Sequence, residues 1–161
     1  MNLWLEKAIR APGLLMLVLL CASCDRKTGG GSRAASDPQL QSHGSIEVTA
    51  QLAEVPEGAI FKRDLYDYTT ILKYKVLKTH RGAVKGDVIF VGHYDPWKPR
   101  SEAADAKVKN IGGALKQFRE GQTHRMALEV PIDEYFMGGI VNKYFGQDTG
   151  PLYWAVWTNL E

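Results

Sequence analysis

Three side chains of the kinds that bind metal ions stand beside apolar stretches of the chain. His93 and Asp95 follow "DVIFVG", and His124 precedes "RMALEV". Imidazole and carboxylate groups suit zinc and related cations, and His80 is a fourth candidate ligand. Together they predict a metal-binding protein or a metal-dependent hydrolase, provided that the fold brings them together. No H-x-x-x-H spacing accompanies them, so the alternative of polar residues at the ends of strands stays open.

The stretch "GHYDPWKPR" is the main candidate for contact with a ligand. Pro96 and Pro99 restrict the backbone on both sides of Trp97. The other candidate contacts in this stretch are Tyr94, Lys98 and Arg100. A stiff loop that presents an aromatic ring between basic groups suits an anionic sugar or a groove on a protein. The alternative is that Trp97 packs over the end of the domain.

A basic run adds Lys73 and Lys75 to the candidate contacts, because the second and third strands of some small barrels bind oligosaccharides or oligonucleotides. The alternative is a solvated strand face. The whole chain has 20 Lys and Arg against 18 Asp and Glu, a net charge of +2. Such a balance is no signature of nucleic-acid binding, and no nucleic-acid partner is expected.

Groups that attack a substrate covalently are poorly represented. The sequence has no G-x-S-x-G motif, and its two cysteines, Cys21 and Cys24, both precede the expected domain. Most serines stand in or beside a glycine-rich segment, and Asp133 and Glu134 are adjacent carboxylates that rarely converge on one bond. We therefore expect a non-catalytic protein without a cofactor, and an enzyme is the alternative.

Five segments with alternating apolar and polar residues must position these side chains. They cover residues 46–52, 70–77, 88–93, 124–130 and 153–158. Alternation of this kind predicts half-buried strands. A short helix is expected near residues 101–111, where Ser101 is a fair N-cap and Gly112 a stop. The sequence therefore predicts an all-β fold, a five-stranded OB-like Greek-key barrel with a short helix between strands 3 and 4.

Two stretches carry a resemblance to known modules. "YKVLKTHRGAVKGDVIFVGHY" and the pattern Phe118-x-x-Gly121-x-x-His124-x-Met126 resemble the netrin-like and tissue-inhibitor-of-metalloprotease modules. The resemblance implies an OB-like barrel over residues 46–158. The inhibitors in that group block a zinc ion through disulfide-bonded N-terminal cysteines, which this domain lacks, so inhibition is not implied. The domain is also faintly similar to small exported proteins of exopolysaccharide-acetylation systems.

The N-terminal segment has the features of an export signal. Lys7 and Arg10 precede the apolar run 14–22, whose nine residues are too few to span a membrane. Cys21-Ala22-Ser23-Cys24 resembles the lipobox of bacterial lipoproteins, although Cys21 stands where leucine is commonest. This resemblance implies removal of residues 1–23 and acyl chains on Cys24 that anchor the protein in a membrane. Stable anchoring by acyl chains takes more than one of them.

Residues 24–44, rich in Gly, Ser and charge, are expected to form a flexible tether, followed by the barrel domain of residues 45–161. The expected protein is an exported lipoprotein on the periplasmic side of a membrane or at the cell surface. Its barrel would be a binding module for a glycan or protein of the envelope, linked to exopolysaccharide modification. The alternatives are a metal-binding protein or hydrolase that uses His93, Asp95 and His124, and a structural adaptor in an envelope complex.

Overall fold

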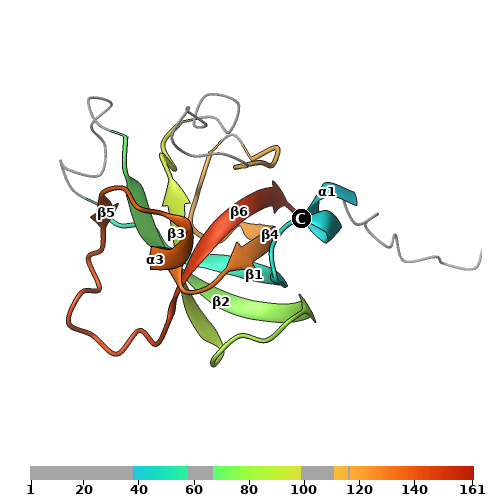
Figure 1. Cartoon of the computed structure of the whole chain (residues 1–161), viewed down its shortest axis with the longest axis horizontal. Helices are drawn as coiled ribbons and strands as arrows, with labels where there is room; N and C mark the ends of the chain where they lie inside the picture. Colours follow the sequence, from blue (N-terminus) through green and yellow to red (C-terminus); the bar gives the residue numbers. More distant parts are fainter. Residues whose placement is uncertain (1–37, 58–66, 99–110, 116) are drawn as a thin grey trace, which may run out of the picture. The chain divides into compact units, whose positions relative to one another are not determined.

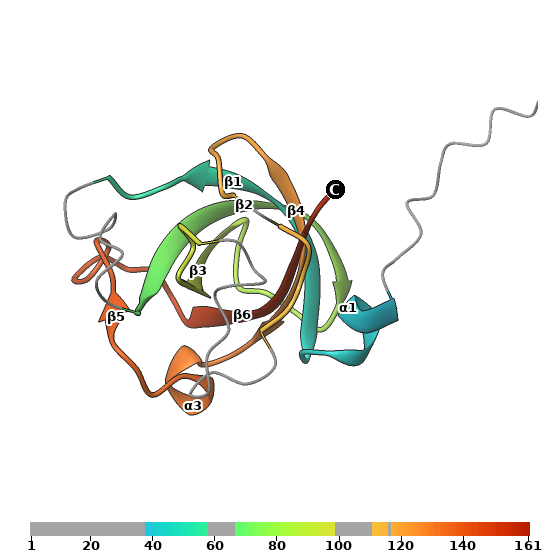
Figure 2. The same ribbon diagram turned by 90° about the horizontal axis from the view of Figure 1, so that it is seen from above.

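Five strands with alternating side chains close into a ring in the computed structural model (Figures 1 and 2). They are β1 (Ile46–Glu54), β2 (Thr69–Arg81), β3 (Val88–Tyr94), β4 (Thr123–Glu129) and β6 (Leu152–Leu160). β1 pairs with β2 and β4, and β6 lies between β3 and β4. Only β3 and β6 run parallel among the pairs that form this ring. This is the arrangement of an OB-like barrel, so the predicted fold is confirmed.

The structure describes residues 38–57, 67–98, 111–115 and 117–161. All of them belong to one unit, Ala34–Glu161. The signal segment, Cys24, Arg100 and the helix expected near residues 101–111 lie outside the described residues.

The interior of the barrel is filled by the side chains that the alternation places on one face of each strand. Val48, Leu72 and Met126 are all 0 % exposed. The inward positions of the barrel strands that pack in this cluster are Ile46, Val48, Ala50, Leu52, Leu72, Tyr74, Ile89, Val91, Met126, Leu128, Tyr153 and Ala155. Burial of these apolar side chains is the main force that holds the barrel together.

A second apolar cluster covers the outside of β3 and β6. Phe90 and Trp154, on the outward faces of these strands, pack with Ile132 and Phe136. Ile132 begins the short helix α3 (Ile132–Tyr135), which lies against the outer side of β6 (Figures 1 and 2). A two-residue strand, β5 (Ile140–Val141), then pairs in parallel with the start of β2. The glycine-rich stretch between β4 and β6 therefore covers a second apolar core on the outside of the barrel.

Residues 38–44, which belong to the expected tether, contact the barrel. Residues 38–42 form a helix, α1 (Pro38–Ser42), whose Leu40 is 1 % exposed. The Arg81 guanidinium donates hydrogen bonds to the carbonyl oxygens of four residues, Leu40, Gln41, His43 and Gly44. Leu40 and Gln41 lie in the last turn of the helix, where carbonyl oxygens lack partners within it, and His43 and Gly44 follow the helix. Arg81 therefore docks the segment on the barrel.

Glu47 and Thr49 alternate with the core residues of β1 and would face solvent in an isolated strand. Glu47 is nevertheless 3 % exposed, because long side chains from β2 and β4 cover it. Arg125 donates to Glu47 Oε1 from Nε at 2.8 Å and from Nη2 at 2.6 Å, and Arg81 Nη1 is 3.4 Å from Oε2. Thr49 Oγ1 lies 2.8 Å from His80 Nε2 and donates to Glu161. Polar and charged side chains thus cover the outer side of β1.

Candidate functional site

One end of the barrel gathers segments from several parts of the chain. β4 begins there at Thr123, opposite Gln51 near the end of β1, and Leu160 at the end of β6 pairs with His124. Because β3 runs parallel to β6, its last residues and the β3–β4 connection reach the same end. The topology therefore brings residues from four distant parts of the chain to one rim.

The segment 111–114 is held against β6 by backbone hydrogen bonds. Gly112 N donates to Val156 O at 2.8 Å, and Thr158 N donates to Gly112 O at 3.2 Å. The amide oxygen of Asn159 accepts from Ala114 N at 2.7 Å. The pairing of β3 with β6 stops at Trp154, so this segment occupies the side of β6 that β3 leaves open. Leu115 and Phe118 follow it and close the barrel core at this end.

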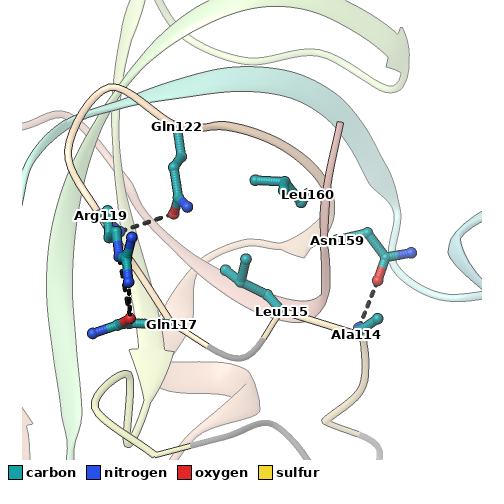
Figure 3. A pocket seen from close by; sticks show the side chains of 7 residues that line it. All are labelled: Ala114, Leu115, Gln117, Arg119, Gln122, Asn159 and Leu160. Atoms are coloured by element: carbon teal, nitrogen blue, oxygen red, sulfur yellow. Dashed lines mark hydrogen bonds between the residues drawn. The ribbon is translucent and has the colours of Figure 1, made fainter.

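A hollow of about 440 Å³ opens between this connection and the end of β6 (Figure 3). Its polar lining comes from Gln117, Arg119, Gln122 and Asn159, and its apolar lining from Ala114, Leu115 and Leu160. In Figure 3 the two leucines lie between the group of Gln117, Arg119 and Gln122 and the pair of Asn159 and Ala114. We call this the amide hollow. It offers hydrogen-bonding groups around an apolar floor, as sites for small ligands do.

A second hollow, of about 300 Å³, shares Arg119 with the first. Its other lining residues are Val55, Pro56, Glu57, Trp97, Phe118 and Glu120. The indole Nε1 of Trp97 is shielded from solvent and has no hydrogen-bond partner among the described residues. We call this the tryptophan hollow. The residue that the sequence marks most clearly for ligand contact therefore does lie in a depression of the surface.

His93 and His124 meet inside the barrel. Tyr74 Oη lies 3.1 Å from His93 Nε2 and 3.1 Å from His124 Nδ1. The ring of Phe118 packs on both imidazoles, with centroids 4.6 Å from His93 and 5.5 Å from His124. Burial lowers the pKa of His124 to about 4, so its ring is neutral at ordinary pH.

The third candidate metal ligand, Asp95, is not part of this cluster. Asp95 Oδ1 accepts from Tyr68 N at 3.3 Å, and its Oδ2 lies 3.4 Å from Lys98 Nζ. Burial and a hydrogen bond with Asp67 raise the pKa of the Asp95 carboxyl group. In the part of the chain that the structure describes, no three His, Cys, Asp or Glu side chains form a group able to hold a metal ion. The described structure brings His93 and His124 together but leaves Asp95 apart from them. A metal site formed by all three side chains therefore stays a prediction.

The remaining predicted contacts are dispersed. Tyr94 is 3 % exposed and packs against Phe136 in the outer core, 5.7 Å between ring centroids. Lys98 donates to Asp67 Oδ1 at 2.7 Å, a bond that raises the pKa of Lys98. Lys73 and Lys75 lie on the outer face of β2, and neither belongs to the described lining of the two hollows. Of the six predicted ligand contacts, Trp97 alone is placed in a hollow by the described residues.

Sequence reasoning missed Gln117, Arg119, Gln122 and Asn159. The first three stand in "LKQFREGQTH", the stretch between the expected helix and the fourth strand. A cluster of two amides and a guanidinium around a buried Phe118 is a weak signal that was available there. Asn159 offers no such signal, because only the closed barrel places it near the others.

No protein-family model, curated protein or solved structure matches this chain. Among the described residues, no helix combines the length and the apolar character required to cross a membrane. The class is therefore defined by the fold and the site alone. It is an OB-like five-stranded barrel that carries two adjoining hollows at one end.

Proposed function

We propose that this chain is an exported lipoprotein, anchored through Cys24, whose barrel binds a glycan of the cell envelope without catalysing a reaction. The observation that carries the proposal is the pair of hollows that share Arg119. Aromatic rings, amides and a guanidinium at one barrel end suit a chain of sugars, which has apolar ring faces and many hydroxyl groups. Amide and guanidinium groups hold a ligand but do not exchange protons at neutral pH.

The barrel topology supports a glycan rather than a peptide. Each of the five barrel strands has a neighbouring strand on both sides. Peptides are often bound by addition of a strand to an open sheet edge, and that mode needs an unpaired edge. Two adjoining depressions instead favour a linear ligand whose successive units occupy separate subsites.

The anchor is tested by Cys24→Ser. We expect the native protein to sediment with membranes and to carry acyl chains, because its apolar segment is too short to span a bilayer. The variant should lose the acyl mass, measured by mass spectrometry, and should lose signal removal at this site. Cys21→Ser is the matched control and should keep both. An unchanged mature mass and unchanged membrane sedimentation in Cys24→Ser would refute the anchor.

The binding role is tested by Trp97→Ala in calorimetric titrations with acidic and neutral polysaccharides. Loss of the indole should weaken binding about tenfold, or about 1.4 kcal/mol, while the fold stays intact. Phe145→Ala is the control, because Phe145 is 90 % exposed and lines neither hollow. Absence of saturable heat with every glycan would contradict a glycan-binding role. Equal affinity of native protein and variant would place the site elsewhere.

A further inference from the structure

The side-chain amides of the amide hollow turn their oxygen atoms toward the protein. Gln117 Oε1 accepts from Arg119 Nε at 3.1 Å and from Arg119 Nη2 at 2.7 Å. Gln122 Oε1 accepts from Arg119 N at 2.9 Å. Asn159 Oδ1 accepts from Ala114 N. The three acceptors are therefore engaged within the protein, two of them by bonds that the dashed lines to Arg119 mark in Figure 3.

The orientation of these amides follows from chemistry. A guanidinium and a backbone N–H can only donate, so the atom that faces them must be the amide oxygen. The NH₂ groups of Gln117 and Gln122 consequently lie on the other branch of each amide. The hollow therefore combines two amide NH₂ groups with the positive charge of Arg119, a set in which donors prevail.

Hydrogen bonds inside the barrel also support this orientation of the Gln122 amide. Gln122 Oε1 lies 3.4 Å from His124 Nε2, so that nitrogen carries the hydrogen. His124 Nδ1 must then accept from the Tyr74 hydroxyl, and Tyr74 Oη in turn accepts from His93 Nε2. A line of hydrogen bonds with one consistent direction thus runs from β3 through β2 and β4 to the edge of the hollow.

We propose that the amide hollow recognises the carboxylate of an acidic sugar, so that the glycan bound by this protein is a polyuronate. This inference rests on the proposed function. A carboxylate only accepts hydrogen bonds, whereas a sugar hydroxyl also donates and would leave its hydrogen unmatched in a donor-rich site. Arg119 adds charge attraction, and the Nη1 side of its guanidinium, which the bonds to Gln117 do not use, donates to a carboxylate. Leu115 and Leu160 supply an apolar surface for the sugar ring.

The tryptophan hollow gives the bound chain a direction. It contains Glu57 and Glu120, which repel a second carboxylate and accept hydrogen bonds from hydroxyl groups. Trp97 and Phe118 offer aromatic surface beside them. The adjacent sugar unit therefore places its hydroxyl groups in the tryptophan hollow, while the carboxylate of the first unit faces Arg119 in the amide hollow.

The test exchanges donors for acceptors without a change of shape. Gln117→Glu and Gln122→Glu each keep the Oε1 acceptor for Arg119 and replace NH₂ by a carboxylate oxygen. The full-length protein, in detergent micelles, is titrated with oligogalacturonate and with the same oligomer after reduction of its carboxyl groups. Each variant should bind oligogalacturonate at least about tenfold more weakly. Gln147→Glu adds the same charge at an exposed position outside both hollows and should change affinity less than about twofold.

The outcomes separate the two claims. Preference of the native protein for oligogalacturonate, lost in Gln117→Glu and Gln122→Glu, supports the carboxylate site. Equal binding of the charged and reduced oligomers overturns the carboxylate site but leaves the glycan-binding function standing. If neither oligomer binds, and a peptide with a free C-terminus binds while its amidated form does not, the ligand is a peptide carboxylate and the polyuronate inference fails. Absence of binding to all four ligands overturns the polyuronate inference as well.

Discussion

Replacement of Gly113 by alanine is expected to cost about 3 kcal/mol of folding free energy. Gly113 has a φ angle of 110°, which side chains with a Cβ atom rarely adopt. An added Cβ would also stand 1.9 Å from the carbonyl oxygen of Thr158. Thr158 belongs to the backbone of β6, so the clash cannot be relieved by rotation of a side chain. Urea denaturation monitored by tryptophan fluorescence would measure the loss.

Gly121→Ala is the matched control for the contact with β6. Gly121 also has a positive φ angle, 83°, but a Cβ built there meets nothing within 4 Å. Its substitution should cost about 1 kcal/mol, the strain of the left-handed backbone alone. Equal losses in the two variants would show that segment 111–114 does not lie close against β6. Since this segment carries Ala114 and is followed directly by Leu115, Gly113→Ala should also weaken ligand binding in the amide hollow.

Acidification from pH 6.5 to about pH 4 is expected to remove about 3 kcal/mol of stability through His124 alone. Burial lowers the pKa of His124 from 6.5 to about 4 in the folded protein. Between these two values the unfolded chain binds a proton that the folded protein does not. Stability from this group is therefore fully present above pH 6.5 and falls as the pH decreases toward 4. The free energy of unfolding across this range would measure it.

His124→Gln isolates this contribution. The variant should be less stable at neutral pH, because it disturbs the hydrogen bonds to Tyr74 and Gln122. Its stability should nevertheless fall more gently with acid, by up to about 1.4 kcal/mol less per pH unit. Burial also lowers the pKa of His80, so His80→Gln should remove part of the remaining slope. The raised pKa of Asp95 acts in the opposite direction and is common to all variants. An identical slope in native protein and His124→Gln would contradict the burial of a neutral imidazole.

The five strands are predictable from the sequence because alternation is a local property. Residues such as Val48, Leu72 and Met126 repeat at every second position, and one face of each strand must be buried. The same alternation places His93 and His124 on inward faces. Pattern alone does not reveal that both approach Tyr74, because their meeting depends on how the three strands close into a ring.

The alternation predicts the wrong burial for some outward-facing side chains, because other elements of the fold cover them. Glu47 alternates with core residues as an outward side chain, yet Arg81 and Arg125 bury it from two other strands. Trp154 is buried on the outside of the barrel because Phe136, beyond β4, stacks on it at 4.9 Å. The residues that bury these side chains are distant in sequence, so no short stretch of the chain contains both partners of a contact.

The sequence by itself determined the strands, the all-β class and the prominence of Trp97, because alternation and proline-restricted loops are properties of neighbouring residues. Only the tertiary structure decided which polar groups share a site. Gln117, Arg119 and Gln122 come from the β3–β4 connection and Asn159 from the end of β6. They surround one hollow because β6 lies between β3 and β4, a long-range pairing that brings the end of the last strand to the rim where the fourth begins.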